Sequence, residues 1–459
     1  MKQDNIHFEE SVFGRAAEDL DYLEMPLHRR IFGAAAVIGA VFICVALVRV
    51  IYLNLNRGEI YAARAFGNAN KEIILPAPRG DILDRFGRPL VRNESVWSVA
   101  VNANVFIKQS PEEQSALIGE LEKILDPTEG DSGVAEILSG ADLENGAAIV
   151  LERGIDTERV IALKALGDPA IIIQDDYRRS YIYGAAASHV LGYTGLASVG
   201  RQIEGKSGLE DFYDSMLRGR DGKFIEGRDV RGAKLFNRYE DQPEPGATLR
   251  TTIDIEFQEY FYNRMKEGLE TLDRDSGVGI ALNPRTGEIL ALMSFPSYDN
   301  NIFTLPGKNR ERTAFLNSRT KPLFNRAISG VYNPGSTWKP AMALAALKEG
   351  VVDPSTSVFS GGVLEVQNPF DASKPSKFLD WKAHGWVNLY SALARSSNIY
   401  FYVIGGGHRD YKDLKPLGVA RIEDYFSRFG FDMPTGIDLP GAAAGVLYGP
   451  DYREKNGRL

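Results

Sequence analysis

One short stretch decides how this chain is interpreted: Tyr332-Asn333-Pro334-Gly335-Ser336-Thr337-Trp338-Lys339-Pro340. Proline followed by glycine predicts a turn. The run 341–347 that comes next contains only good helix formers, and Gly350 ends it. We therefore expect Ser336 at or just inside the N-terminus of a helix.

Ser336 and Lys339 are three residues apart and would share one face of that helix. A serine hydroxyl becomes a useful nucleophile when a base takes its proton, and a desolvated lysine can be that base. The alternative is an N-cap serine followed by a surface lysine. A second Ser-x-x-Lys, Ser318 to Lys321, is followed by Pro322 and no apolar run, so we interpret it as a loop.

Composition narrows the class of protein. A chain of 459 residues suggests about three structural units, and 44% hydrophobic with 25% charged residues is typical of a chain that folds around real cores. The net charge of −8 argues against nucleic acid as a partner. The single Cys44 excludes an intrachain disulfide, and the five histidines show no metal-binding spacing. We expect no metal and no cofactor.

The N-terminal region predicts a membrane anchor. Residues 1–30 are polar and end in two arginines, and residues 31–48 contain no charge. With its extension, the segment 31–53 is long enough to cross a bilayer of roughly 30 Å. A cleaved signal peptide or a buried core helix are the alternatives, but the run is long for a signal peptide and no cleavage site follows it. We expect a signal-anchor helix with residues 1–30 in the cytoplasm.

Residues 54–247 predict a mixed α+β region without a catalytic constellation, which we interpret as a spacer or interaction module. Ser110-Pro111-Glu112-Glu113 is a capping box that opens a helix to about Leu125. A second helix is expected over 156–166, then a strand over 170–174 and a loop over 177–183. The turn-rich segment 76–90 predicts an ordered loop with surface ion pairs.

Residues 248–459 predict the second folded region. Asp254 can cap a helix to about Leu272, and the apolar runs 278–282 and 288–295 flank a Pro/Gly turn, which predicts a hairpin. Asn388 can cap a helix that reaches Ser396-Ser397-Asn398 and continues through the apolar run 399–404.

The pair of motifs is more specific than either motif alone. Ser336-x-x-Lys339 is followed about sixty residues later by Ser396-x-Asn398. This arrangement resembles the active site of penicillin-binding proteins and serine β-lactamases, for which these motifs are diagnostic.

The resemblance covers nearly all of residues 31–459, in the right order, and is strongest to class B, monofunctional penicillin-binding proteins. Within them it is strongest to the penicillin-binding protein 2 group of the elongation machinery, with a division-specific relative as second choice. The further matching segments are Pro78-Arg79-Gly80-Asp81-Ile82-x-Asp84-Arg85-x-Gly87, Gly205-x-x-Gly208-Leu209-Glu210, Asn283-Pro284-x-Thr286-Gly287-Glu288, Asn325-Arg326-Ala327 and Gly436-Ile437-Asp438-Leu439-Pro440.

The resemblance implies an α+β fold with three parts. These are a transmembrane helix at 31–53, an elongated α+β pedestal or dimerisation-like domain at 54–247, and a transpeptidase domain at 248–459. The last would combine an antiparallel sheet with a helical subdomain.

The resemblance also implies the chemistry. Ser336 would attack the penultimate D-Ala carbonyl of a peptidoglycan stem peptide, and Lys339 would take its proton. Ser396 would relay a proton to the leaving amine, while Asn398 would hold Lys339 and the substrate. An amine of a second stem would resolve the acyl-enzyme into a cross-link, and β-lactams would acylate Ser336. Water would resolve it in a D,D-carboxypeptidase or β-lactamase, and a non-catalytic membrane scaffold or penicillin sensor is a further alternative.

One motif of the family does not match. The family's Lys-Thr/Ser-Gly should follow Ser-x-Asn well downstream, and the sequence reaches Leu459 without it. Lys206-Ser207-Gly208 precedes the nucleophile and is rejected. We therefore expect a transpeptidase domain that is incomplete at its C-terminal end. Some relatives bind zinc beside the cleft, and Asp380 and His384 could belong to such a site, but no cysteine is there to join them.

The implied setting is the bacterial inner membrane, with one crossing and the bulk of the chain in the periplasm. The implied partners are stem peptides, β-lactams, a SEDS-family glycan polymerase and other elongation-complex proteins.

Overall fold

The computed structural model describes residues 32–33, 36–52, 70–125, 133–143, 148–196, 203–228, 234–368, 371, 373–449, 452 and 454. The chain divides into two compact units. One comprises Met1–Glu72 with Glu226–Asn237, and the other comprises Ile73–Ile225 with Arg238–Leu459.

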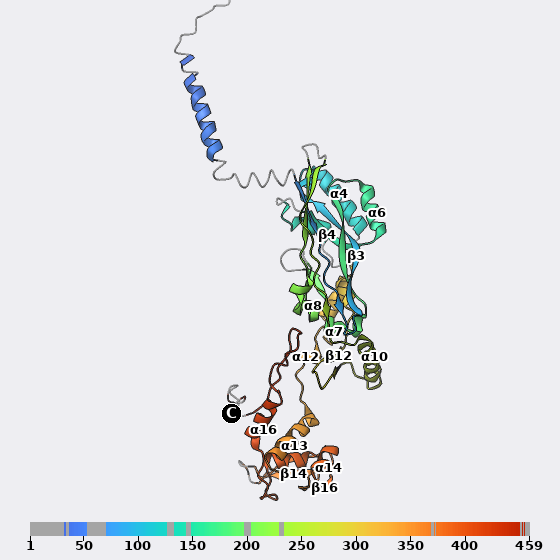
Figure 1. The fold of residues 1–459 in the computed structure, drawn as a ribbon, viewed down its shortest axis with the longest axis vertical. Coiled ribbons are helices and arrows are strands. Elements are labelled where there is room, and N and C mark those ends of the chain that lie inside the picture. The colour runs from blue at the N-terminus through green and yellow to red at the C-terminus, as the bar shows by residue number, and fades with distance from the viewer. Residues whose placement is uncertain are drawn as a thin grey trace, which may run out of the picture. The chain divides into compact units, whose positions relative to one another are not determined.

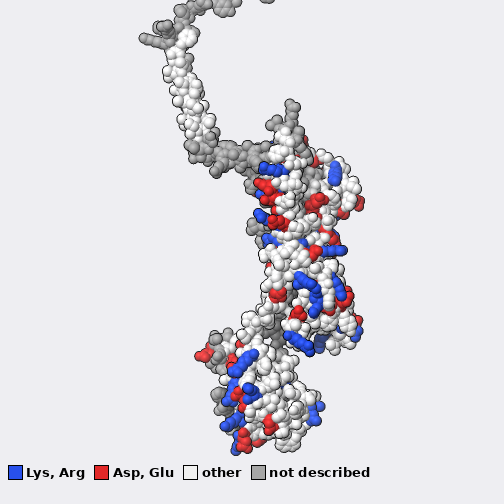
Figure 2. Space-filling view, viewed as in Figure 1, with Lys and Arg blue, Asp and Glu red and all other residues white. Residues whose placement is uncertain are grey.

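In the first unit, residues 36–52 are helical and present a row of exposed apolar side chains, Val41 and Val48 among them. Figure 2 shows this helix almost entirely without charged side chains. Across the described ranges, no helix combines the length and the apolar character that a bilayer crossing requires. The expected span 31–53 extends outside the described residues at both ends, so it stays a prediction.

The second unit begins with a sheet organised around one long strand, β3 (Pro89–Asn102). It pairs antiparallel with β4 (Ala148–Ile155) and β5 (Ile171–Tyr181). The full order is β10-β2-β3-β4, with β5 also on β3. The short strands are β2 (Ile82–Leu83) and β10 (Leu249–Arg250), which pair in parallel.

The helices of this region pack against the sheet, and α4 and α6 lie together beside it (Figure 1). Their bounds are α3 (Ala103–Phe106), α4 (Pro111–Leu125), α5 (Val134–Ser139) and α6 (Thr157–Leu166). The predicted capping box is present, since Ser110 and Glu113 each accept from the other's backbone N–H. Leu121 of α4 and Val99 of β3 are completely buried in one shared core. Burial of the apolar faces of helix and strand against each other stabilises this packing.

The loop predicted over 177–183 is wrong for residues 177–181. Strand β5 continues to Tyr181 because each of its residues down to that point has a partner in β3, ending with Tyr181 opposite Val91. Of the arginines in this stretch, Arg179 is buried against Glu210, whereas Arg178 pairs with a partly exposed Glu94.

The region after β5 is built of short elements. They are η2 (Gly184–Ala186), α7 (Ser188–Leu191), β6 (Thr194–Leu196), β7 (Ile203–Gly205), α8 (Gly208–Phe212), α9 (Asp214–Leu217), β8 (Gly222–Arg228) and β9 (Lys234–Asp241). β6 pairs with β7, and β8 lies between β1 (Asn70–Leu75) and β9.

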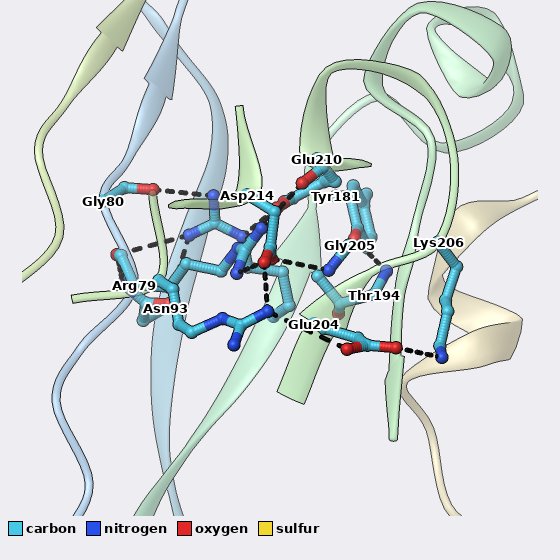
Figure 3. A network of polar contacts seen from close by, with 12 residues as sticks. Arg79, Gly80, Asn93, Tyr181, Thr194, Glu204, Gly205, Lys206, Glu210 and Asp214 are labelled. Atoms are coloured by element: carbon cyan, nitrogen blue, oxygen red, sulfur yellow. Dashed lines mark hydrogen bonds and ion pairs between the residues drawn. The ribbon is translucent and has the colours of Figure 1, made fainter. Parts of the chain in front are cut away.

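The predicted surface ion pairs of segment 76–90 are also wrong in one respect, because the main one is buried. Arg79 Nε donates to Glu210 Oε2 at 2.6 Å, and Arg179 Nε donates to Glu210 Oε1 at 2.7 Å. The Glu210 side chain is completely buried. Asp214 completes the cluster with a contact of 2.8 Å to Arg79 Nη1 (Figure 3).

The same cluster fixes the backbone around it. Arg179 donates from Nη2 to the Gly80 carbonyl at 2.7 Å. A Cβ at Gly80 would lie 1.9 Å from the Ala247 carbonyl oxygen, so only glycine allows the chain to pass there. Residues 78–80, 205–214 and 246–247 are thereby held together.

The hairpin and the helix predicted after residue 248 are confirmed. α10 (Ile255–Thr271) is capped by Asp254 and covers one face of the antiparallel pair β11 (Gly277–Leu282) and β12 (Ile289–Phe295). The connecting elements are η3 (Asn300–Phe303), α11 (Asn309–Leu316) and α12 (Arg326–Ser329). No strand forms over 435–441, where Leu439 is buried against the core that contains Leu209.

A separate core holds the last helices. It contains α13 (Lys339–Lys348), α14 (Leu389–Ala394), α15 (Asn398–Gly406) and α16 (Gly418–Arg428). Two small antiparallel sheets lie at its edge, β13 (Val358–Ser360) with β16 (Gly385–Val387) and β14 (Val363–Val366) with β15 (Ser376–Leu379). Helices α13, α14 and α16 are labelled around it in Figure 1.

Replacing Glu210 with glutamine tests the buried cluster. We expect Glu210→Gln to lower the free energy of unfolding by about 3–5 kcal/mol, because two buried guanidinium groups lose their shared counter-charge. Chemical denaturation measures this. Glu120→Gln, which breaks an exposed pair with Lys123, serves as the control and should change it by less than about 1 kcal/mol. Equal effects of the two substitutions would contradict the assignment.

Candidate active site

The turn predicted before the Ser336 helix is present in tighter form. Gly335 has φ +58°, a left-handed conformation that favours glycine, and it opens a short 3₁₀ turn, η4 (Gly335–Trp338). The α-helix α13 begins only at Lys339, whose backbone N–H donates to the Ser336 carbonyl. Ser336 therefore lies on the 3₁₀ turn that directly precedes α13, rather than inside the helix.

The Ser-x-Asn motif lies where two helices break, and this corrects the expectation of one continuous helix. α14 is opened by a capping box of Asn388 and Ser391, as predicted for Asn388, and it ends at Ala394. Ser396 has φ +56°, which is uncommon for serine and stores strain. Ser397 then caps α15, of which Asn398 is the first residue.

Lys339 joins these two segments through its ammonium group. Its Nζ donates to the Ser396 carbonyl oxygen at 2.8 Å and to Asn398 Oδ1 at 2.6 Å. Ser396 Oγ lies 3.3 Å away. The structure thus brings together Lys339, Ser396 and Asn398 from segments nearly sixty residues apart.

Ser336 is the fourth predicted site residue. It is exposed, and among the described residues its hydroxyl has no hydrogen-bond partner. It lies one turn from Lys339 on the same segment, without a direct bond to Nζ in this structure. Its exposure leaves the hydroxyl open to a substrate.

The surroundings of Lys339 lower the pKa of its ammonium group. Burial lowers the pKa of Lys339, and the nearby Asp380 carboxylate opposes this without cancelling it. A neutral amine has two N–H donors and one lone pair. The two short contacts are to carbonyl oxygens, which only accept. Once Lys339 is deprotonated, its lone pair is therefore left to accept the proton of a hydroxyl, as a general base does.

Asp380 lies behind the site and is ionised. Burial acts to raise its pKa, but the backbone N–H groups of Asn398 and Ile399 outweigh burial, helped by the hydroxyls of Ser397 and Ser360, and lower the pKa to about 2. Sequence reasoning considered Asp380 only as a zinc ligand. Its signal was weak, because it follows a short exposed strand with no periodic pattern.

Asp380 and His384 were considered as zinc ligands, and the structure shows how they lie. His384 Nε2 lies 3.6 Å from Asp380 Oδ1, and both side chains are fully buried. Within the described part of the chain, no three His, Cys, Asp or Glu side chains gather as a metal would require. The other groups around Asp380 are hydroxyls and N–H donors, which suit an anion rather than a cation.

The lowered pKa of Lys339 can be measured directly. In a pH titration of ¹³C-methylated lysines, we expect the Lys339 resonance to titrate below the ordinary lysine value of about 10.5, because burial disfavours its charge. Loss of the resonance in Lys339→Arg assigns it. A midpoint at or above the ordinary value would contradict this description of the site.

Two family profiles match the chain in tandem. The Penicillin-binding Protein dimerisation domain matches residues 74–251, and the Penicillin binding protein transpeptidase domain matches residues 277–456. The predicted domain boundary at residue 247 lies close to residue 251, where the match to the dimerisation domain ends. The predicted domain limits stay predictions.

Curated relatives match over most of the chain. Peptidoglycan D,D-transpeptidase MrdA of Haemophilus influenzae is 28% identical over 90% of this chain, and that of Acinetobacter baumannii is 30% identical over 92%. These alignments cover 62% and 61% of the relatives. The chain therefore spans less than two thirds of their length.

Solved structures match as well. Penicillin-binding protein PBP2 of Helicobacter pylori in complex with MreC is 25% identical, with a TM-score of 0.67 over 85% of this chain and 70% of that one. A chain from a peptidoglycan synthase complex that coordinates polymerization and crosslinking is 26% identical, with a TM-score of 0.61 over 93% of this chain and 71% of that one.

Proposed function

Because the chain belongs to the class B penicillin-binding proteins of the PBP2 group, we propose that it carries the nucleophile, base and amide of a peptidoglycan D,D-transpeptidase. The observation that carries the proposal is the pair of short bonds from Lys339 to Ser396 and Asn398, one turn from the exposed Ser336. The same constellation is diagnostic of acyl-serine enzymes.

The first half-reaction makes an acyl-enzyme. Ser336 Oγ attacks the penultimate D-Ala carbonyl of a stem peptide while its proton passes to Lys339 Nζ. The backbone N–H of Ser336 faces the developing oxyanion as one half of an oxyanion hole. The C–N bond then breaks, and terminal D-Ala leaves with a proton relayed through Ser396. Asn398 holds Lys339 and the substrate amide.

The second half-reaction transfers the acyl group. An amine of a neighbouring stem attacks the ester, the bond to Ser336 Oγ breaks, and the proton returns to Oγ through Lys339. The product is a cross-link between two stems. A β-lactam stops this sequence after the first step because its acyl group stays on Ser336.

The labelling experiment has an internal control. In the full-length protein, Ser336→Ala should abolish covalent labelling by a fluorescent penicillin, because no oxygen remains to be acylated. Ser318→Ala, in the second Ser-x-x-Lys of the chain, should label like wild type. Labelling that survives Ser336→Ala would refute the assignment.

Product analysis separates the enzyme classes. Incubation with stem peptides and labelled acceptor should give cross-linked dimers. Trimmed monomers alone would indicate a D,D-carboxypeptidase, and absence of any acyl-enzyme would indicate a non-catalytic scaffold.

We further propose that residues 31–53 anchor the protein in the inner membrane with the bulk of the chain in the periplasm. The support is the uncharged run 31–48 and the apolar surface of the helix 36–52. A helix of this length spans about 26 Å, close to the thickness of the hydrocarbon core.

Fractionation tests the anchor. Full-length protein should remain with membranes after alkaline carbonate extraction, whereas a variant lacking residues 1–53 should appear in the soluble fraction. Release of the full-length protein by carbonate would show peripheral attachment instead.

The structures of relatives suggest which proteins this chain works with. The relative from Helicobacter pylori was solved with MreC, and another relative was solved within a peptidoglycan synthase complex. We propose that this chain likewise works beside a SEDS-family glycan polymerase and elongation-complex proteins, since a cross-linking enzyme needs newly made strands.

A further inference from the structure

Asp380 is a fully buried carboxylate directly behind the Ser-x-Asn segment. Three donors converge on its Oδ2: Ser397 Oγ at 2.8 Å, Ser360 Oγ at 2.9 Å and the backbone N–H of Ile399 at 3.1 Å. The other oxygen accepts from the Trp381 backbone N–H at 3.0 Å. One side chain therefore accepts these four hydrogen bonds, and the backbone N–H of Asn398 also stabilises its charge.

These donors belong to separate elements. Ser360 ends strand β13, Ser397 and Ile399 form the start of helix α15, and Asp380 follows strand β15. The backbone of Asp380 is itself fixed, because its N–H donates to the Gly362 carbonyl at 2.9 Å. The carboxylate thus anchors the N-terminus of α15 to the two small antiparallel sheets.

The anchored residues directly flank the proposed catalytic groups. Ser396, with its strained left-handed backbone, precedes Ser397, and Asn398 precedes Ile399. Asn398 also donates from Nδ2 to the Leu379 carbonyl at 3.2 Å, next to Asp380. A shift of this helix end would move both acceptors of the Lys339 amine.

We propose that Asp380 is the positioning residue of this site, which holds Ser396 and Asn398 at hydrogen-bonding distance from Lys339. The inference rests on the proposed function. Asp380 contacts neither substrate nor Ser336 in this role, and acts through the segment 396–399. Its negative charge suits the start of a helix, where unpaired N–H groups carry partial positive charge.

Two substitutions form a graded series. Asp380→Ala leaves all four donors without their acceptor, and we expect the second-order rate constant for acylation by a fluorescent penicillin to fall by about 100-fold. Asp380→Asn can turn its carbonyl oxygen toward the three donors on Oδ2, so it should recover part of the rate, to about 10-fold below wild type.

The control is a second hydrogen-bonded aspartate outside the site. Asp353 Oδ1 accepts from the backbone and hydroxyl of Ser355 and from the backbone N–H of Thr356, at 2.6–2.8 Å. Asp353→Asn should leave the acylation rate constant within about 2-fold of wild type, since its bonds close a turn away from Lys339.

The pH profile separates positioning from simple loss of folded protein. Asp380 is the charged group that raises the pKa of Lys339. On α16, Tyr425 and Arg421 contact Glu349 at the opposite end of α13 from Lys339, and Arg428 pairs with Asp424. Of the others packed nearby, His384 faces Asp380, and Arg395 donates to the His384 carbonyl. In Asp380→Asn, the acid limb of the acylation profile should therefore move to lower pH.

The results divide cleanly. If wild type is labelled at Ser336 and the Asp380 variants acylate at the wild-type rate, the inference is wrong and the proposed function survives. If wild type is not labelled, both fall together. Should Asp380→Ala fail to fold, Ser397→Ala decides, because it removes one of the same bonds. A drop of about 10-fold supports the inference, and an unchanged rate overturns it.

Discussion

The candidate site depends on one amine that is shared between two helices. Lys339 begins α13, and its Nζ bonds the Ser396 carbonyl and the Asn398 side chain at the break between α14 and α15. Neither helix could place these groups alone, because the acceptors lie on a strained turn whose serine has φ +56°. The strain persists because the surrounding bonds fix the turn from both sides. The result is an amine that has lost part of its hydration yet keeps two directed bonds, which is the condition a lysine base needs.

The region before residue 248 also depends on buried charged side chains, but there each charge is paired with an opposite charge. Glu210 lies between Arg79 and Arg179, and its side chain has no contact with solvent. Such a cluster contributes little net stability compared with an apolar core, but it strongly penalises any arrangement that leaves one charge without its partner. We interpret it as a device that fixes the register of three chain segments at the end of the long sheet. In the candidate site, by contrast, Ser336 is exposed, and the nearby Asp380 only partly offsets the effect of burial on the pKa of Lys339.

The sequence predicted much of this organisation, and its errors have a common cause. The helices over 111–125, 157–166 and 255–271 and the hairpin 277–295 follow from capping residues and apolar spacing, which act locally. The loop predicted over 177–183 was wrong for residues 177–181, and the ion pair of Arg79 within 76–90 is buried rather than on the surface. Both errors arise because side chains there pair with segments far away in the sequence. No local pattern reveals that Arg79, Arg179 and Glu210 neutralise one another inside the fold.

By itself, the sequence selected the candidate site residues: Ser336, Lys339, Ser396 and Asn398 follow from residue type, spacing and resemblance. Only the tertiary structure decided how they meet. It placed Ser336 on a 3₁₀ turn before α13, broke the expected helix at Ser396, and set the buried Asp380 behind Asn398. The physical reason is that hydrogen bonds between segments twenty to sixty residues apart depend on packing, whereas a sequence pattern reports only which neighbours share a turn or a face.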